Sequence, residues 1–102
     1  MNGVSAFIHA LTNQVYKIIP LAEAEASGTD CHLVKYIDSI VVSMDGAMHI
    51  FGELNANGSY LSVLCTLRGV REISEFKTIR SEVLRCLKVL NFIEKQVGGD
   101  LS

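Results

Sequence analysis

The chain has 102 residues, a net charge of −2, 49% hydrophobic residues and 20% charged residues. This length fits one domain, residues 1–102, and leaves little room for a second. Near-neutral charge argues against a general nucleic-acid binder, which needs a clear excess of Lys and Arg. So large an apolar share on a short chain predicts that part of the apolar surface is buried in a subunit interface.

The sequence contains no run near the roughly 20 apolar residues of a membrane helix, and its start does not resemble a signal peptide. We therefore expect a cytoplasmic protein with no membrane partner. The three cysteines, Cys31, Cys65 and Cys86, are odd in number and widely spaced. This pattern predicts neither a disulfide framework nor a zinc site, and no metal or cofactor is expected.

The first quarter of the chain has the apolar spacing of a helix. Residues recur at intervals of three and four along one face: Val4, Phe7, Ile8, Leu11, Val15, Ile18 and Ala22. Pro20 interrupts this pattern because its ring removes a backbone donor and disfavours helix at Ile19. Either one helix kinks there, or a short second helix follows from Leu21 to Ala26. Ser27-Gly28 ends the helical segment in both cases.

The segment from Cys31 to Met44 fits two structures. A helical stripe is one possibility, formed by Leu33, Ile37, Ile40, Val41 and Met44. The β-branched run Ile40-Val41-Val42 and the following Asp45-Gly46 favour the other, because Asp-Gly is typical of the type I′ turn of a β-hairpin. We predict a strand over Val34–Ser43.

Two more strands are expected after this turn. Met48–Leu54 is the second, Asn55–Gly58 is a turn rich in residues that tolerate positive φ, and Ser59–Leu67 is the third. This register collects apolar residues on one sheet face and leaves the other face half apolar, so that it needs a covering partner. The apolar face contains Ile37, Val41, Met48, Ile50, Leu54, Leu61, Val63 and Cys65.

The last element is a long helix from about Ser74 to Val97, ended by Gly98-Gly99. Its apolar residues repeat as a heptad: Phe76, Ile79, Val83, Cys86, Leu90, Ile93 and Val97. The fold class predicted for the chain is therefore α+β. It consists of an N-terminal helix, kinked or split at Pro20, a three-stranded antiparallel meander, and a long C-terminal helix packed on the sheet.

Two groups of residues are candidate sites. On the second sheet face, the register puts Asp38 opposite Glu53 and Glu53 opposite Tyr60, with His49 nearby. Facing carboxylates can bind a cation or share a proton, unless they lie at a solvated sheet end or pair with an arginine. The second group, Arg68, Gly69 and Arg71, lies between the third strand and the last helix. It could bind an anion through guanidinium groups and backbone amides, or it could form a plain turn.

No motif in the sequence identifies a reaction, and no catalytic residue is predicted. The first hypothesis is a small non-enzymatic interaction or assembly protein that acts as a homodimer or binds a protein partner, supported by the apolar content and the heptad stripe. The alternative is a small-ligand-binding protein or enzyme that uses Asp38, Glu53, Tyr60 and His49. A nucleic-acid module is not expected, because Glu72, Glu75, Glu82 and Glu94 are interleaved with the basic residues near the C-terminus.

Overall fold

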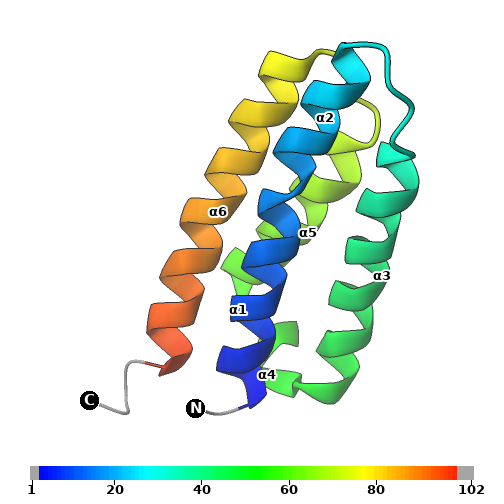
Figure 1. Cartoon of the computed structure of the whole chain (residues 1–102). Helices are drawn as coiled ribbons and strands as arrows, with labels where there is room; N and C mark the ends of the chain where they lie inside the picture. Colours follow the sequence, from blue (N-terminus) through cyan, green and yellow to red (C-terminus); the bar gives the residue numbers. More distant parts are fainter. Residues whose placement is uncertain (1–2, 99–102) are drawn as a thin grey trace.

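The structure is a computed structural model that describes residues 3–98. Over these residues every regular element is a helix and none is a strand (Figure 1). The helices are α1 (Gly3–Tyr16), α2 (Ile18–Ala26), α3 (Leu33–Ile50), α4 (Gly52–Asn55), α5 (Gly58–Val70) and α6 (Phe76–Gly98). The protein is therefore all-helical, and the predicted α+β class is wrong.

The helices form an up-down-up-down four-helix bundle. α1 and α2 follow one another as a broken rod, and α3, α5 and α6 supply the other three long elements (Figure 1). The α1–α2 rod packs against α6 on one side and α3 on the other, while α5 contacts both α3 and α6. The short α4 lies against α3 and α5 at the end where α1 begins.

The chain breaks between α1 and α2 at Lys17, three residues before Pro20. Pro20 is the third residue of α2, where a helix needs no backbone donor, so the ring is tolerated in this first turn. The Leu21 N–H donates to the Lys17 carbonyl at 3.3 Å and continues the rod. Of the two alternatives, one kinked helix or two helices, the structure has two helices, and the second begins at Ile18. α2 ends at Ala26, and Gly28 follows with a φ of 100°.

The predicted meander is wrong at all three strands. The segment predicted as strand over Val34–Ser43 lies inside α3, Met48–Leu54 spans the end of α3 and most of α4, and Ser59–Leu67 lies inside α5. The predicted turn at Asn55–Gly58 runs from the last residue of α4 to the first residue of α5 and so connects two helices. The sheet face that was expected to need a covering partner therefore does not exist.

α3 follows the helical stripe, and burial explains why. Its buried residues are Leu33, Ile37, Ile40, Val41, Met44 and Ala47, which repeat at three and four residues and face the other helices. Gly46 lies on the exposed side of this helix, and a methyl group built there would meet nothing within 4 Å. Mid-helix glycine costs only about 1 kcal/mol relative to alanine. Burying six side chains outweighs that cost, so Asp45-Gly46 does not form a turn.

α5 was mistaken for a strand because its apolar residues fit both periods. The structure buries Tyr60, Val63, Leu64, Leu67 and Val70, a helical set. Two residues that the strand register placed in the core lie elsewhere: Leu61 is half-buried and Cys65 is exposed. The Asn57 side chain caps the helix, since its Oδ1 accepts from the Tyr60 N–H at 3.1 Å.

The heptad stripe of the last helix is confirmed. Its central residues, Ile79, Val83, Cys86, Leu90 and Ile93, are all buried. The stripe faces α1, α2 and α5 of the same chain, so it is used in the bundle core and is not available for a coiled coil with a second chain. Gly99, part of the predicted stop, lies outside the described residues.

One continuous core runs between the four rods. The largest side chains that are almost fully buried come from every long element: Tyr60, Ile8, Leu11, Ile18, Ile37, Ile40, Met44, Leu54, Leu67, Leu90, Ile93 and Val15. No buried side-chain nitrogen or oxygen in the described part of the chain lacks a hydrogen-bond partner. The polar side-chain atoms inside the bundle are therefore all hydrogen-bonded, and function has to be sought on the surfaces and at the ends of the bundle.

Candidate functional site

The four residues predicted to bind a ligand are not brought together. Asp38 lies on α3 and pairs with Arg71: the distance from Arg71 Nη1 to Asp38 Oδ1 is 2.6 Å. Tyr60 is fully buried on α5 and donates its hydroxyl hydrogen to the Met44 carbonyl at 2.8 Å. His49 and Glu53 are exposed near the end of α3 and on α4. The proposed cluster depended on strand pairing, so its members separate when the segments are helices.

The residues predicted to bind an anion lie at the C-terminal end of α5. Arg68 Nη2 is 2.9 Å from Asp45 Oδ2, and Arg71 Nε donates to the Arg68 carbonyl at 3.2 Å. A helix C-terminus presents carbonyl oxygens, so Gly69 does not offer the free backbone amides that the anion hypothesis invoked. Both arginines instead link α5 to α3 through partly exposed ion pairs, each worth at most about 1 kcal/mol.

A cleft of about 260 Å³ opens at the end of the bundle where α2 meets α3. Its walls are mostly apolar, with Glu25 and Arg71 as the charged side chains. The N–H groups of Cys31 and Leu33 donate to Glu25 Oε1 at 3.4 and 3.1 Å, which supports the start of α3 after His32, a residue with a φ of 52°. Since Arg71 is paired with Asp38, both charged groups of the cleft already have structural partners.

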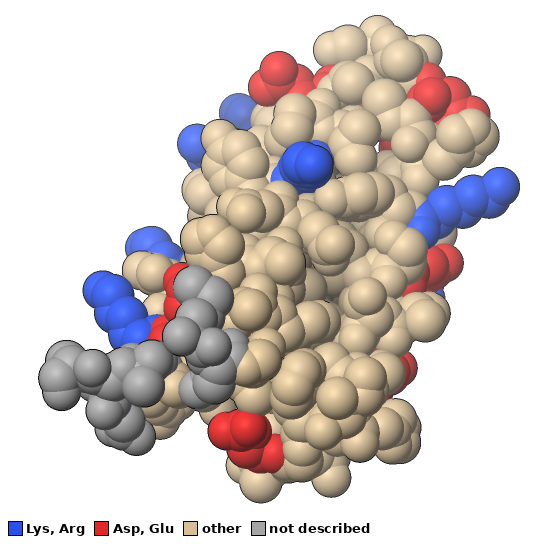
Figure 2. Space-filling model, turned by 60° about the horizontal axis from the view of Figure 1, so that its bottom comes forward, with Lys and Arg blue, Asp and Glu red and all other residues tan. Residues whose placement is uncertain are grey.

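The surface that α1 and α3 share is nearly free of charge. α1 contains no Lys, Arg, Asp or Glu, and the residues of α3 that flank it are uncharged as well. We call this surface the α1–α3 face; it comprises Gly3, Ala6, Phe7, Ala10, Asn13 and Gln14 from α1, and Tyr36, Ser39, Ser43, Gly46 and Ile50 from α3. Figure 2 looks onto this side and the lower end of the bundle, where the centre is uncharged and most charged side chains lie near the outline.

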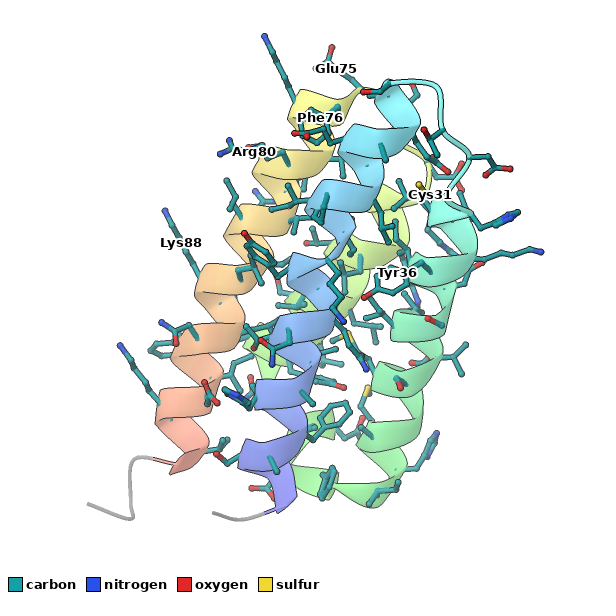
Figure 3. All side chains as sticks on the ribbon, in the orientation of Figure 1. Cys31, Tyr36, Glu75, Phe76, Arg80 and Lys88 are labelled. Carbon is teal, nitrogen blue, oxygen red and sulfur yellow. The ribbon has the colours of Figure 1, made fainter. Side chains whose placement is uncertain are left out.

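One large apolar side chain, Ile50, projects from the α1–α3 face, and a second, Val42, lies beside it. Ile50 is 75% exposed and Val42 is 69% exposed, the highest values among the large hydrophobic residues that the structure describes. Val42 has Asp38 and Asp45 as its helical neighbours on the α5 side of α3. Around them the face is held firmly. Tyr36 reaches from α3 towards α1 (Figure 3) and donates its hydroxyl hydrogen to the Gln14 carbonyl at 2.7 Å. Phe7 packs on Phe51 with ring centroids 6.1 Å apart. A partner would therefore meet a preformed surface.

The side of α6 that faces away from the bundle is positively charged, unlike the uncharged α1–α3 face. Residues at helical spacing form a stripe that we call the α6 outer face: Lys77, Arg80, Leu84, Lys88, Asn91 and Lys95. Figure 3 shows Arg80 and Lys88 pointing away from the bundle on the same side. The two acidic residues of α6 lie at its margins, where Glu82 pairs with Arg85 and Glu94 with His9. The interleaved charges of the sequence are thus separated in space.

Other chemistry on the described part of the molecule is limited. No group of three or more His, Cys, Asp or Glu side chains is placed to hold a metal ion over residues 3–98. Burial raises the pKa of Tyr60, with a smaller contribution from the negative charge of Asp45. Burial also raises the pKa of the Cys86 thiol to about 11, so this thiol stays protonated at neutral pH. Among the helices of residues 3–98, none combines the length and the apolar character needed to cross a membrane.

Sequence reasoning overlooked both surfaces. A signal for the α1–α3 face was present, since residues 1–16 contain no Lys, Arg, Asp or Glu at all. On the predicted last helix, the spacing of Lys77, Arg80, Lys88 and Lys95, which puts them on one side, was a signal for the α6 outer face. Comparison of the chain with protein-family models, with curated proteins and with solved structures gives no match.

Proposed function

We propose that the protein is a non-enzymatic interaction module that forms a homodimer through the α1–α3 face. The observation that carries the proposal is the charge-free surface of α1 and the adjoining side of α3, from which Ile50 projects. Exposed apolar side chains on a surface without charged residues are typical of the centre of a protein interface. The α5 side of α3 differs, because there Asp38 and Asp45 form ion pairs with arginines.

The size of the face supports a protein partner. A standard interface buries about 800 Å² on each partner, which is roughly one-seventh of the 5975 Å² accessible surface of the chain. The molecule measures 45 × 25 × 19 Å, so one long side can supply this area. The Tyr36 hydrogen bond and the Phe7–Phe51 contact hold the surface in place before binding, which reduces the entropy lost on association.

The charges at the ends of the α1–α3 face support a second copy of the chain as the occupant. Lys17 and Lys35 lie at one end, level with the start of α3, and Glu53 lies at the other end beyond Phe51. An antiparallel two-fold dimer places the lysines of each copy against Glu53 of the other. A parallel dimer would bring like charges together, so the antiparallel arrangement is favoured.

Analytical ultracentrifugation of Ile50→Glu tests the proposal. We expect the unmodified protein to sediment at twice the chain mass and the variant at the mass of one chain. A carboxylate without a partner in a buried interface costs about 3–5 kcal/mol, which raises the dimer Kd by roughly a hundredfold or more. Val42→Glu should weaken the dimer less, because Val42 lies beside the α1–α3 face, next to Asp38 and Asp45.

Val34→Glu is the matched control. Val34 is also on α3 and is 51% exposed, but it lines the cleft near Arg71 and lies outside the α1–α3 face. The control should stay dimeric. A monomer for the unmodified chain from micromolar to hundreds of micromolar concentration would refute the proposal, and so would a dimer that Val34→Glu disrupts and Ile50→Glu does not.

A further inference from the structure

The α6 outer face holds four cations without an acidic partner. Lys77, Arg80, Lys88 and Lys95 are exposed, and over residues 3–98 none of them forms an ion pair. They recur at helical spacing on the side opposite the buried stripe. From Lys77 to Lys95 the row is about 27 Å long at 1.5 Å per residue. The cations therefore form a single line along the helix.

The negative net charge of the whole chain gives no indication of this line of cations. α6 carries five of the nine Lys and Arg residues and two of the eleven Asp and Glu residues, so its net charge is +3 and that of the rest of the chain is −5. The overall net charge of −2, which argued against nucleic acid, is the sum of two regions of opposite charge. A polyanion would be attracted to α6 and repelled elsewhere.

Two exposed aromatic side chains border the line. Phe92 is 58% exposed and is a helical neighbour of both Lys88 and Lys95. Tyr16, also 58% exposed, lies two turns beyond His9 on the same side of α1. Because His9 Nδ1 is 3.0 Å from Glu94 Oε1 and the two helices are antiparallel, Tyr16 borders α6 near the level of Lys88. Cations with an aromatic ring on each side are the elements of a single-strand binding track.

We propose that the α6 outer face binds single-stranded nucleic acid, with the cations on the phosphates and with Tyr16 and Phe92 as stacking sites for bases. A single strand fits because the line is only one helix wide, about 10–12 Å. A broad anionic surface such as a membrane would also press against acidic side chains at the margins, including Glu94 and Glu75, which Figure 3 shows at the end of the bundle next to Phe76. An acidic polypeptide would leave the two aromatic rings unused.

This surface is separate from the α1–α3 face, so the inference does not rest on dimerisation. The Ile50→Glu variant should bind nucleic acid through α6 with the same affinity per site as the unmodified chain. Loss of binding in Ile50→Glu would show that the nucleic acid binds to the α1–α3 face and not to the α6 outer face.

Fluorescence anisotropy with a labelled oligouridylate or oligothymidylate tests the proposal. We expect binding at low salt that weakens with a slope of about −3 in log K against log salt, from four phosphate contacts at about 0.7 each on single strands. Arg80→Ala/Lys88→Ala should reduce affinity by at least about tenfold and lower that slope to about −1.4. Asn55→Asp/Ala56→Asp is the matched control: it changes the net charge by the same amount at two exposed positions at the end of α4. Affinity should stay within about twofold of the unmodified protein.

Phe92→Ala and Tyr16→Ala separate nucleic acid from other polyanions. Each should weaken binding by about fivefold or more if a base stacks on the ring, while circular dichroism confirms that both variants remain helical. The proposal is overturned by an absence of binding at low salt, or by aromatic variants that bind normally. Polyglutamate that competes as well as the oligonucleotide would also overturn it, as would phosphatidylglycerol vesicles that bind in its place.

Discussion

Replacing Tyr60 with phenylalanine probes the centre of the bundle. The Tyr60 side chain has no accessible surface, and its hydroxyl donates to the Met44 carbonyl of α3 at 2.8 Å. Phe fills nearly the same space, so Tyr60→Phe removes the hydroxyl and leaves the packing in place. The Met44 carbonyl lies inside α3 and keeps its acceptor role within the helix.

At pH 7 we expect Tyr60→Phe to lower the free energy of unfolding by about 1 kcal/mol. A buried hydrogen bond between neutral groups contributes about 0.5–1.5 kcal/mol net. The loss in the free energy of unfolding should not exceed this range by much, because the Met44 carbonyl that loses the hydroxyl keeps its partner within the helix. Tyr16→Phe, at an exposed position, should change stability by less than about 0.5 kcal/mol.

The cost of Tyr60→Phe should vanish in alkali. Burial, followed by the charge of Asp45, raises the pKa of Tyr60 above its ordinary value of 10.0. Above pH 10 the phenol ionises in the unfolded chain while it stays neutral in the folded one, so the unmodified protein loses about 1.4 kcal/mol per pH unit from this group. The variant lacks the phenol, and the two unfolding free energies should therefore cross near pH 11.

Urea unfolding followed by circular dichroism at intervals from pH 7 to pH 11 measures this difference. Both proteins should already lose stability above pH 9, because burial raises the pKa of Cys86 from 9.0 to about 11 and the unfolded thiol ionises first. That loss is common to both proteins and cancels in their difference. A difference that stays constant up to pH 11 would show that Tyr60 is not buried as described, and the account of the core would fail with it.

Two further substitutions test the local structure of the middle segments. Gly46→Ala should stabilise the chain by about 1 kcal/mol, because residue 46 is helical and its added methyl group meets no other atom within 4 Å. Measuring it in the Ile50→Glu background keeps dimerisation out of the comparison, and a loss of stability would favour the hairpin turn instead. Asn57→Ala should cost about 1 kcal/mol in urea unfolding, because Asn57 Oδ1 caps α5 through the Tyr60 N–H, and an unchanged midpoint would contradict the cap.

The helices at the two ends of the chain could be predicted from residue spacing alone. The α6 stripe from Ile79 to Ile93 is long enough that only a helix satisfies its period, and the stripe from Val4 to Ala22 has the same property. Pro20 made a break predictable, although not its place at Lys17. These features depend on contacts between residues three and four apart, which a sequence displays directly.

The middle of the chain could not be assigned in this way. Ile40-Val41-Val42 and Asp45-Gly46 favour a hairpin locally, whereas the stripe from Leu33 to Met44 favours a helix. Strand and helix preferences of such residues differ by less than about 1 kcal/mol each. The burial of Ile37, Ile40 and Met44 against the other helices outweighs them, and that burial exists only in the assembled bundle.

The candidate surfaces show the same division. The sequence by itself determined that α1 is uncharged, that the heptad stripe of α6 is apolar and that basic residues gather near the C-terminus. Only the tertiary structure decided that the heptad stripe is used inside the chain and that Asp38 meets Arg71, 33 positions away. It also decided that Glu82 and Glu94 lie beside the cations instead of among them. Charge separation of this kind depends on which side of each helix faces the core, and the packing of all four rods together settles that choice.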